Sequence, residues 1–222
     1  SDPGLPWKTA PIQNHNNIEN TQTFRSTKRH DRHYTKSNGV DYIPSPIEGI
    51  DFDLIISLPH GENLMEWYAY NVFDFHRQVS MLFSTISEYC TCKTCPRMTA
   101  GSGYQYLWSE GIPSPIDMPA PNYIWRLLNL IENQLDDENI FPSSQNKPFP
   151  DNIEKIVKNI MKRLFRVYAH FYYHHINHFL QLKVAKELDT SFIHFIRFNN
   201  KYKLIQPQQL EPLSNLISNI IS

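Results

Sequence analysis

Apolar side chains recur every three or four residues over several long stretches of the chain, which is the spacing of one buried face of an α-helix. The clearest stretch is residues 63–89, where one face carries Leu64, Trp67, Tyr68, Asn71, Val72, Phe75, Val79, Leu82, Phe83 and Ile86. A second stretch covers residues 151–180, with Ile153, Ile156, Val157, Ile160, Leu164, Val167, Tyr168 and Phe171 on one face and Asp151 as the expected N-cap. Shorter helices are expected at 121–135, 191–202 and 208–221.

Glycine and proline mark where these helices stop. All seven glycines fall at or before Gly111, and proline is absent from residues 60–95 and 151–206. Because an internal proline costs a helix about 3 kcal/mol, the proline-free windows suit the two longest helices. Loops are expected at 90–120, with a short strand at 104–108, and at 136–150.

The first part of the chain differs from the rest. Residues 1–58 are polar and aperiodic and contain five prolines, so we expect an extended arm with a short strand at 52–58. The fold class is therefore mainly α: an N-terminal extended, regulatory arm over residues 1–50 and a helical bundle domain over residues 51–222.

Composition and charge narrow the possible partners. The chain has 222 residues, of which 41% are hydrophobic and 13% aromatic, which suits one globular domain. The formal net charge of −1 gives no reason to expect a nucleic acid or a membrane surface as partner. No apolar run approaches the roughly 20 residues needed to span a bilayer, so we expect no membrane span.

Cysteines and histidines form two clusters with the chemistry of metal ligands. Cys90, Cys92 and Cys95 lie within six residues, and an odd, tight set argues against a disulfide framework and for a metal or redox site in a reducing compartment, the cytosol or nucleus. Four histidines lie near the end of the second long helix: His170, His174, His175 and His178. Two thiols and two imidazoles complete a tetrahedral zinc site, which is structural when all four ligands are protein atoms.

Spacing alone leaves the choice of ligands open. Cys92 or Cys90 can pair with Cys95, and His170 can pair with His174 or His175. The alternative is that the histidines lie on the surface and the thiols are incidental. No phosphate-binding glycine loop, nucleophile elbow or His-Glu-x-x-His motif is present. A zinc-dependent enzyme with one metal position open to water is the remaining catalytic alternative.

Basic residues gather on the second long helix. Lys158, Lys162 and Arg166 are spaced by four and Arg163 lies next to them, so they form one stripe. Such a stripe can hold a phosphate through charge-assisted contacts, or it can be a solvated face.

Acidic residues gather at the start of the first long helix. Residues 60–76 contain Glu62, Glu66 and Asp74 and neither Lys nor Arg. This surface suits a basic helical partner, with Trp67 as an apolar anchor, although ordinary solvation and core packing of Trp67 are the alternatives.

Several motifs occur together, in one order, from about Leu58 to the C-terminus. They are Leu58-Pro-His-Gly-Glu62 with Glu66-Trp67, Glu88-Tyr-Cys-x4-Cys95-Pro, Pro119-Ala-Pro-x-Tyr123, Leu135-Asp-Asp-Glu138, Phe141-Pro-Ser143, Arg163-Leu-Phe-Arg-Val-Tyr-Ala-His170-x4-His175 and Thr190-Ser-Phe-x-His-Phe195. In these motifs the chain resembles the Mob (Mps-one-binder) family of kinase co-activators. The stretch Ser45–Ile50 departs from the family pattern, because it lacks the threonine found there in family members.

The resemblance implies a Mob-type helical bundle with a structural Zn2+ held by Cys90, Cys95, His170 and His175. Five residues of a regular helix turn by about 140°, so the helix should be irregular or end between the two histidines. The resemblance also assigns phosphothreonine binding to Lys162, Arg163 and Arg166, and kinase binding to Glu62, Glu66, Trp67 and Asp74.

The implied function is that of a non-catalytic adaptor and kinase activator. Its partners would be the N-terminal regulatory region of NDR/LATS-class Ser/Thr kinases and phosphothreonine segments of upstream Ste20/Mst-class kinases, in Hippo-like or mitotic-exit signalling. We expect it in the cytoplasm, with the nucleus and the spindle poles or centrosomes as further sites.

The arm carries one candidate modification site. Thr23-Phe24-Arg25 is followed by Lys28 and Arg29 and resembles the family's N-terminal phosphorylation site. A phosphate adds about −1.5 to −2 charge, so phosphorylation of Thr23 could neutralise the basic arm or free the acidic surface for the kinase. The alternative is that Thr23 lies in a tail whose phosphorylation changes nothing.

Overall fold

The computed structural model describes residues 40–221 with their side chains and, of residues 26–27, the backbone alone. Thr23 and the basic residues around it lie outside the described residues. The described chain is mainly helical, as the sequence indicated. Its elements are β1 (Ser26–Thr27), α1 (Phe52–Ile55), α2 (Leu64–Ile86), β2 (Thr99–Ala100), β3 (Tyr104–Tyr106), α3 (Ala120–Asp136), α4 (Ile153–His174), α5 (Ile176–Gln181), α6 (Ala185–Lys201), α7 (Pro207–Leu210), the 3-10 turn η2 (Glu211–Leu213) and α8 (Ser214–Ile221).

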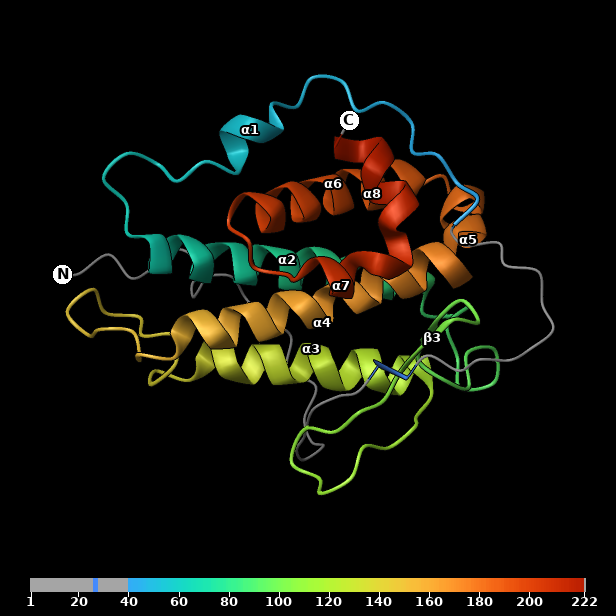
Figure 1. Ribbon diagram of the computed structural model, residues 1–222, viewed down its shortest axis with the longest axis horizontal. Helices are drawn as coiled ribbons and strands as arrows, with labels where there is room; N and C mark the ends of the chain where they lie inside the picture. Colours follow the sequence, from blue (N-terminus) through green and yellow to red (C-terminus); the bar gives the residue numbers. More distant parts are fainter. Residues whose placement is uncertain (1–25, 28–39, 222) are drawn as a thin grey trace.

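The four long helices α2, α3, α4 and α6 lie alongside one another, as Figure 1 shows, and α2 contacts each of the other three. Aromatic side chains fill the space between α2 and α6. Phe75 is fully buried, and its ring meets the rings of Phe195 and Phe198 edge-on at 5.1 and 5.6 Å between centroids. Such edge-to-face pairs add about 0.5–1.5 kcal/mol each to the burial of their apolar area.

The ends of α2 and α3 follow from local chemistry. Asn63 precedes α2, and its Oδ1 accepts hydrogen bonds from the backbone N–H groups of Met65 and Glu66 at 2.7 and 3.3 Å. Pro121 lies in the first turn of α3, where its missing N–H costs nothing. Both helices agree closely with the predicted ranges.

A small antiparallel sheet covers one end of α4. Its strand order is β1-β3-β2, with Thr99 opposite Gln105 and Ser26 opposite Tyr106. The predicted strand at 104–108 is present as β3, which ends at Tyr106, and Trp108 forms an isolated bridge with Ile116.

The predicted strand at 52–58 is wrong. Phe52–Ile55 forms α1, capped by Asp51, whose carboxylate accepts a hydrogen bond from the Leu54 N–H at 3.0 Å. Phe52 and Ile56, four residues apart, are buried, while Leu54 is 71% exposed. This is the spacing of a helix and not of a strand.

Helix α4 differs from prediction at both ends. It begins at Ile153, and neither Asp151 nor the preceding residue Asn152 is observed to cap it through its side chain. It ends at His174, because His175 has φ −131° and ψ 2°, outside the helical range, and α5 follows as a separate helix. The predicted continuous helix over 151–180 is therefore two helices, and the break falls before His175, as expected from two ligands five residues apart.

The C-terminal helices also differ. α6 begins at Ala185, six residues before its predicted start, after a turn in which Lys183 has a φ of +60°. The predicted helix at 208–221 is divided into α7, η2 and α8, because Pro212 has no backbone N–H to donate within a continuous helix.

Residues 40–51 contain no helix or strand and are attached to the bundle by a buried carboxylate. Asp189 in α6 is 1% exposed, and it accepts hydrogen bonds from the hydroxyls of Tyr42 and Tyr172 at 2.7 and 2.8 Å. Burial raises the pKa of Asp189, although the two tyrosine hydrogen bonds act in the opposite direction. This contact fixes the described part of the arm on α4 and α6.

Candidate metal centre and charged surfaces

Cys90 and Cys95 lie in the tight turn that follows α2. The Cys90 N–H continues the helix by donating to the carbonyl of Ile86 at 3.0 Å, and the Cys95 N–H donates to the carbonyl of Thr91 at 2.8 Å. Thr94 Oγ1 closes the turn with a hydrogen bond to the carbonyl of Tyr89 at 2.6 Å. These bonds place both thiols on the side of the turn that faces α4.

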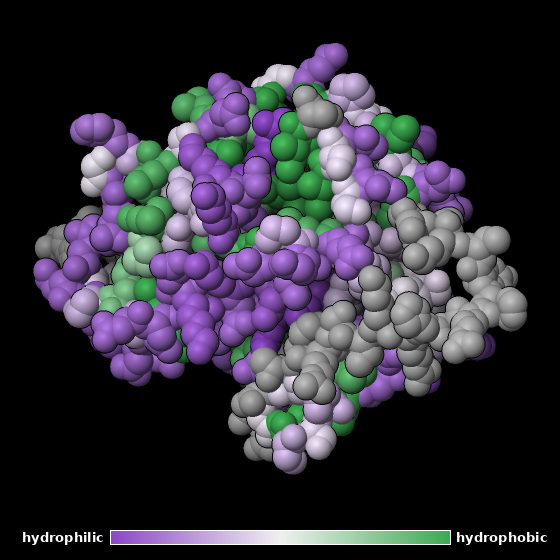
Figure 2. Space-filling model, in the orientation of Figure 1, coloured by the Kyte–Doolittle hydropathy of each residue, from purple (hydrophilic) through white to green (hydrophobic). Residues whose placement is uncertain are grey.

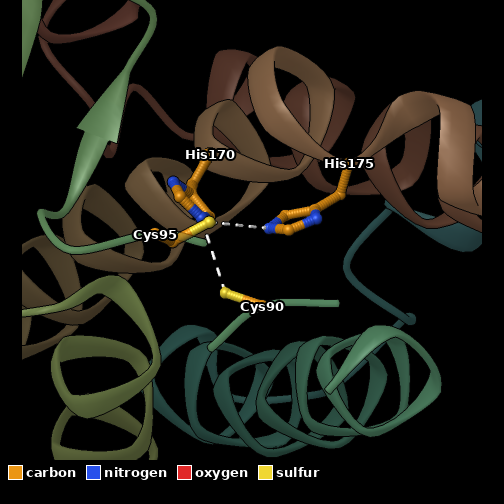
Figure 3. A group of neighbouring side chains, drawn as sticks. All are labelled: Cys90, Cys95, His170 and His175. Carbon is orange, nitrogen blue, oxygen red and sulfur yellow. Dashed lines mark hydrogen bonds between the residues drawn. The ribbon is translucent and has the colours of Figure 1, made fainter. Parts of the chain in front are cut away.

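His170 and His175 complete the group from the other side. The four side chains point toward one another in Figure 3, and their donor atoms all lie within 4.8 Å of each other. Cys90 Sγ is 3.6 Å from His170 Nε2, and Cys95 Sγ is 3.5 Å from His175 Nε2. All four residues are buried, at 7% exposure or less.

These distances fit a tetrahedral metal site. With a Zn–S bond of about 2.3 Å and a Zn–N bond of about 2.0 Å, neighbouring ligand atoms of a tetrahedron are about 3.5 Å apart. The surrounding groups also orient the imidazoles. His170 Nδ1 lies 2.8 Å from the carbonyl of Thr99 in β2, which leaves Nε2 directed at the thiols. The four side chains can therefore hold a metal ion.

Ionisation in this group favours metal binding. The pKa of the Cys95 thiol is lowered, mainly by the hydrogen bond from Cys90 and further by His170 and His175, while the pKa of Cys90 is raised by the same shared proton and by burial. Burial and the neighbouring His170 lower the pKa of His174 to about 4, so that imidazole is uncharged at neutral pH. The group can thus supply the thiolate of Cys95 as a metal ligand, and the neighbouring His174 adds no positive charge that would repel a metal ion.

One cysteine and one histidine lie outside this group of four side chains. Cys92 is exposed, with its Sγ 3.4 Å from Asn122 Oδ1. His174 Nε2 lies 2.9 Å from Thr99 Oγ1. The pairs left open by spacing are therefore Cys90 with Cys95 and His170 with His175, and the end of α4 before His175 is what lets two histidines five residues apart reach one point.

The basic stripe lies only partly on a solvated face. Lys158 pairs with Glu154 one turn away and Lys162 is partly exposed, but Arg163 and Arg166 are only 5% and 1% exposed. Figure 2 shows hydrophilic residues gathered over α4 and α3, whereas apolar residues gather near the C-terminus over α6 and α8. The interpretation of the stripe as a simple solvated face is wrong for the two arginines.

Arg163 and Arg166 are held by residues that sequence spacing did not indicate. Arg163 Nη2 pairs with the carboxylate of Glu110 in the loop between β3 and α3. Arg166 Nη1 donates to the hydroxyl of Tyr123 in α3 at 2.9 Å, and its guanidinium carbon lies 5.3 Å from the ring centre of Tyr106 in β3. We call Lys162, Arg163 and Arg166 the basic cluster.

The electrostatics of the basic cluster reflect its burial. Burial, followed by the charge of Arg166, lowers the pKa of Arg163 to about 10, and the same two causes lower the pKa of Lys162. Arg163 therefore remains cationic at neutral pH. A partly buried, crowded group of cations is a favourable place for an anion.

The acidic residues lie just before α2 (Glu62) and along its first three turns (Glu66 and Asp74). Glu62 is exposed, Glu66 and Asp74 are half-buried, and within residues 40–221 none of the three is seen to pair with Lys or Arg. Trp67 both packs against the core and contributes to the exposed surface. Its ring lies 6.5 Å from that of the buried Phe198 and stacks at 5.6 Å on Tyr70, which is 41% exposed.

Within the described residues, no helix is both long enough and apolar enough to cross a membrane.

The comparisons with known proteins agree with the motifs. The model of the Mob1/phocein family matches residues 45–213. The chain belongs to the Mob1/phocein family. It is 47% identical over 169 residues to MOB kinase activator-like 1A of Arabidopsis thaliana, a match that covers 75% of this chain and 79% of the relative. It is 42% identical over 207 residues to MOB kinase activator-like 1A of Medicago sativa subsp. falcata, covering 91% and 95%. It is 40% identical over 213 residues to MOB kinase activator-like 1 homolog B of Dictyostelium discoideum, covering 92% and 95%.

The expected family is confirmed, and the metal centre and the basic cluster both fall inside the matched region.

Proposed function

We propose that this Mob-family protein is a non-catalytic adaptor that binds a protein kinase and raises its activity. Its relatives carry the name of kinase activators. The observation that carries the proposal is the closed Cys90, Cys95, His170 and His175 centre, in which every position of a tetrahedron is supplied by a buried protein atom. A catalytic zinc site keeps one position for water or substrate, so the enzyme alternative finds no support here.

The metal in this proposal is Zn2+ and its role is structural. Two thiols and two imidazoles at these distances are the donor set that Zn2+ takes in closed sites. The ion would tie the turn after α2 to the end of α4, segments that are 80 residues apart in the sequence.

The kinase partner in this proposal is of the NDR/LATS class, bound through its N-terminal regulatory region. Glu62, Glu66 and Asp74 offer negative charge that is not neutralised by a described Lys or Arg, and the exposed ring of Tyr70 stacked on Trp67 offers apolar area beside it. A basic, amphipathic kinase helix matches both properties.

The second partner is a phosphothreonine segment of an upstream Ste20/Mst-class kinase, bound at the basic cluster. Lys162 is the accessible cation of the cluster, and Arg163 and Arg166 lie behind it, where few water molecules compete for their hydrogen bonds. A phosphate at the edge of the cluster would receive charge-assisted hydrogen bonds in a site of low dielectric.

The test is reconstitution with purified components. A kinase of the NDR/LATS class should co-purify with this protein through its N-terminal region and phosphorylate a substrate faster in the complex than alone. An intact, metal-loaded protein that neither binds that region nor changes the rate would refute the proposed function.

A further inference from the structure

Glu110 brings a carboxylate into the basic cluster from a separate part of the chain. It lies in the loop between β3 and α3, 53 residues before its partner Arg163, and the base of this loop is fixed by two backbone hydrogen bonds between Trp108 and Ile116 at 2.8 and 2.7 Å. The Glu110 side chain is 26% exposed, whereas that of Arg163 is 7% exposed. The more accessible partner of the pair is therefore the carboxylate on the loop.

The charge on Glu110 occupies hydrogen-bonding capacity that a phosphate would need. Burial lowers the pKa of Arg163, and the repulsion from the nearby charge of Arg166 lowers it further. A carboxylate paired with Arg163 relieves this repulsion. An incoming phosphate relieves it too, but the phosphate and the carboxylate repel each other if both remain.

We propose that Glu110 is an intramolecular competitor of the phosphate, which weakens phosphopeptide binding until the ligand displaces it from Arg163; the inference rests on the proposed phosphothreonine site. A peptide carboxylate carries a single charge and gains little by replacing another carboxylate. A phosphate carries about −1.5 to −2 charge and three acceptor oxygens, so it displaces Glu110 with a net gain. Glu110 thereby keeps the binding of acidic, unphosphorylated segments to the basic cluster weak.

The surrounding structure provides a place for the displaced side chain. A cavity of about 220 Å3 between α3 and α4 is lined by both Glu110 and Arg163. Lys155, which is exposed, and Asn159 line the same cavity. The cavity also has apolar walls, among them Leu127 and Ile131, so a displaced carboxylate would turn toward its polar side, where Lys155 lies.

The experiment compares wild type with Glu110→Gln, which removes the charge but keeps a carbonyl oxygen that accepts from Arg163. Peptides of one sequence with threonine, phosphothreonine or glutamate at the central position are titrated at fixed salt. Glu110→Gln replaces a charged competitor by a neutral one, so it should bind the phosphothreonine peptide about tenfold more tightly than wild type. The glutamate peptide should also bind more tightly, while the threonine peptide is unaffected. Asp117→Asn is the matched control, since Asp117 pairs with Arg97 at the surface and its change should leave all three affinities as they were.

The outcomes separate the inference from the function on which it rests. Wild-type binding that depends on phosphate but is equal or weaker in Glu110→Gln would overturn the competitor role and leave the phosphothreonine site standing. Phosphate-dependent binding that emerges only in Glu110→Gln would support the competitor role and refute the site in the wild-type protein. Phosphate-independent binding in both proteins refutes both. Glu110→Ala, tested in parallel with circular dichroism as a check of folding, should give the same ranking.

Discussion

Replacement of Cys95 by serine removes one of the two thiols through which the proposed Zn2+ would hold the turn after α2. Cys95 is 7% exposed, and it faces His175 across a sequence separation of 80 residues. Serine is nearly the same size, but its hydroxyl stays protonated and is a poor ligand for zinc. The change therefore tests the metal bond and leaves the packing of the turn almost intact.

The expected loss can be worked from the length of chain that the metal closes. Cross-linking two points 80 residues apart removes about 4 to 5 kcal/mol of chain entropy from the unfolded state. For a domain of this size, 1 kcal/mol shifts the melting temperature by about 2–4 °C. We therefore expect Cys95→Ser to melt about 10 °C or more below wild type, since lost coordination energy adds to the entropy.

The assay is thermal unfolding followed by circular dichroism, together with the metal content of each protein. Cys92→Ser is the matched control, because it changes an exposed thiol three residues away and should melt within about 2 °C of wild type with its full metal content. Chelation should lower the wild type to the melting temperature of Cys95→Ser. If Cys95→Ser keeps both the metal and the melting temperature of the wild type, the structural role assigned to the site is wrong.

Three further predictions concern the charged residues. Lys162→Ala should weaken phosphothreonine-peptide binding about tenfold and leave the melting temperature unchanged. Arg166→Ala should lower the free energy of unfolding, measured in urea, by about 2 kcal/mol or more, because it leaves the Tyr123 hydroxyl without its buried partner. Equal stability of the two variants would contradict this prediction. Glu66→Lys should weaken binding of the kinase regulatory segment about tenfold or more in calorimetry, while Glu187→Lys, at an exposed site on α6, should not; equal effects would place the partner elsewhere. Folding raises the pKa of Asp189, so the folded state binds this proton more tightly than the unfolded state does. The unfolding free energy of wild type, measured relative to Asp189→Asn, should therefore fall as pH rises from about 4 through the raised pKa and stay level above it. A difference that grows with pH would refute the assignment.

Much of the fold could be predicted because the long helices carry strong local signals. The apolar spacing of α2, its cap Asn63 and the proline at the start of α3 act within a few residues of one another, so they can be seen in sequence. The end of α4 before His175 has no such signal, since neither glycine nor proline occurs there. Tertiary contacts decide that boundary, because His175 must turn toward Cys95.

The basic cluster shows a signal that was present but not used. Arg163 lies three residues after Ile160 and four before Val167, both of which are buried, so it shares their face of α4. Spacing among the charged residues alone left open whether the stripe is a phosphate site or a solvated face, whereas spacing relative to the apolar residues indicates that the arginines are buried. Glu110 and Tyr123 could not be predicted as partners, since they reach Arg163 and Arg166 only through the packing of another loop and helix.

The metal centre and the basic cluster are both held between α4 and the paired strands β2 and β3. Arg166 and His170 are one helical turn apart on α4, and both are almost fully buried. Arg166 lies over Tyr106 in β3, while His170 is bonded to Thr99 in β2, and the two strands pair with each other. Loss of the metal would free His170 and the strand that orients it, and the same strands position Tyr106 against Arg166. Weak phosphopeptide binding by Cys95→Ser would therefore report a disturbed sheet, and only a variant such as Lys162→Ala, which leaves both strands in place, isolates the contact to phosphate.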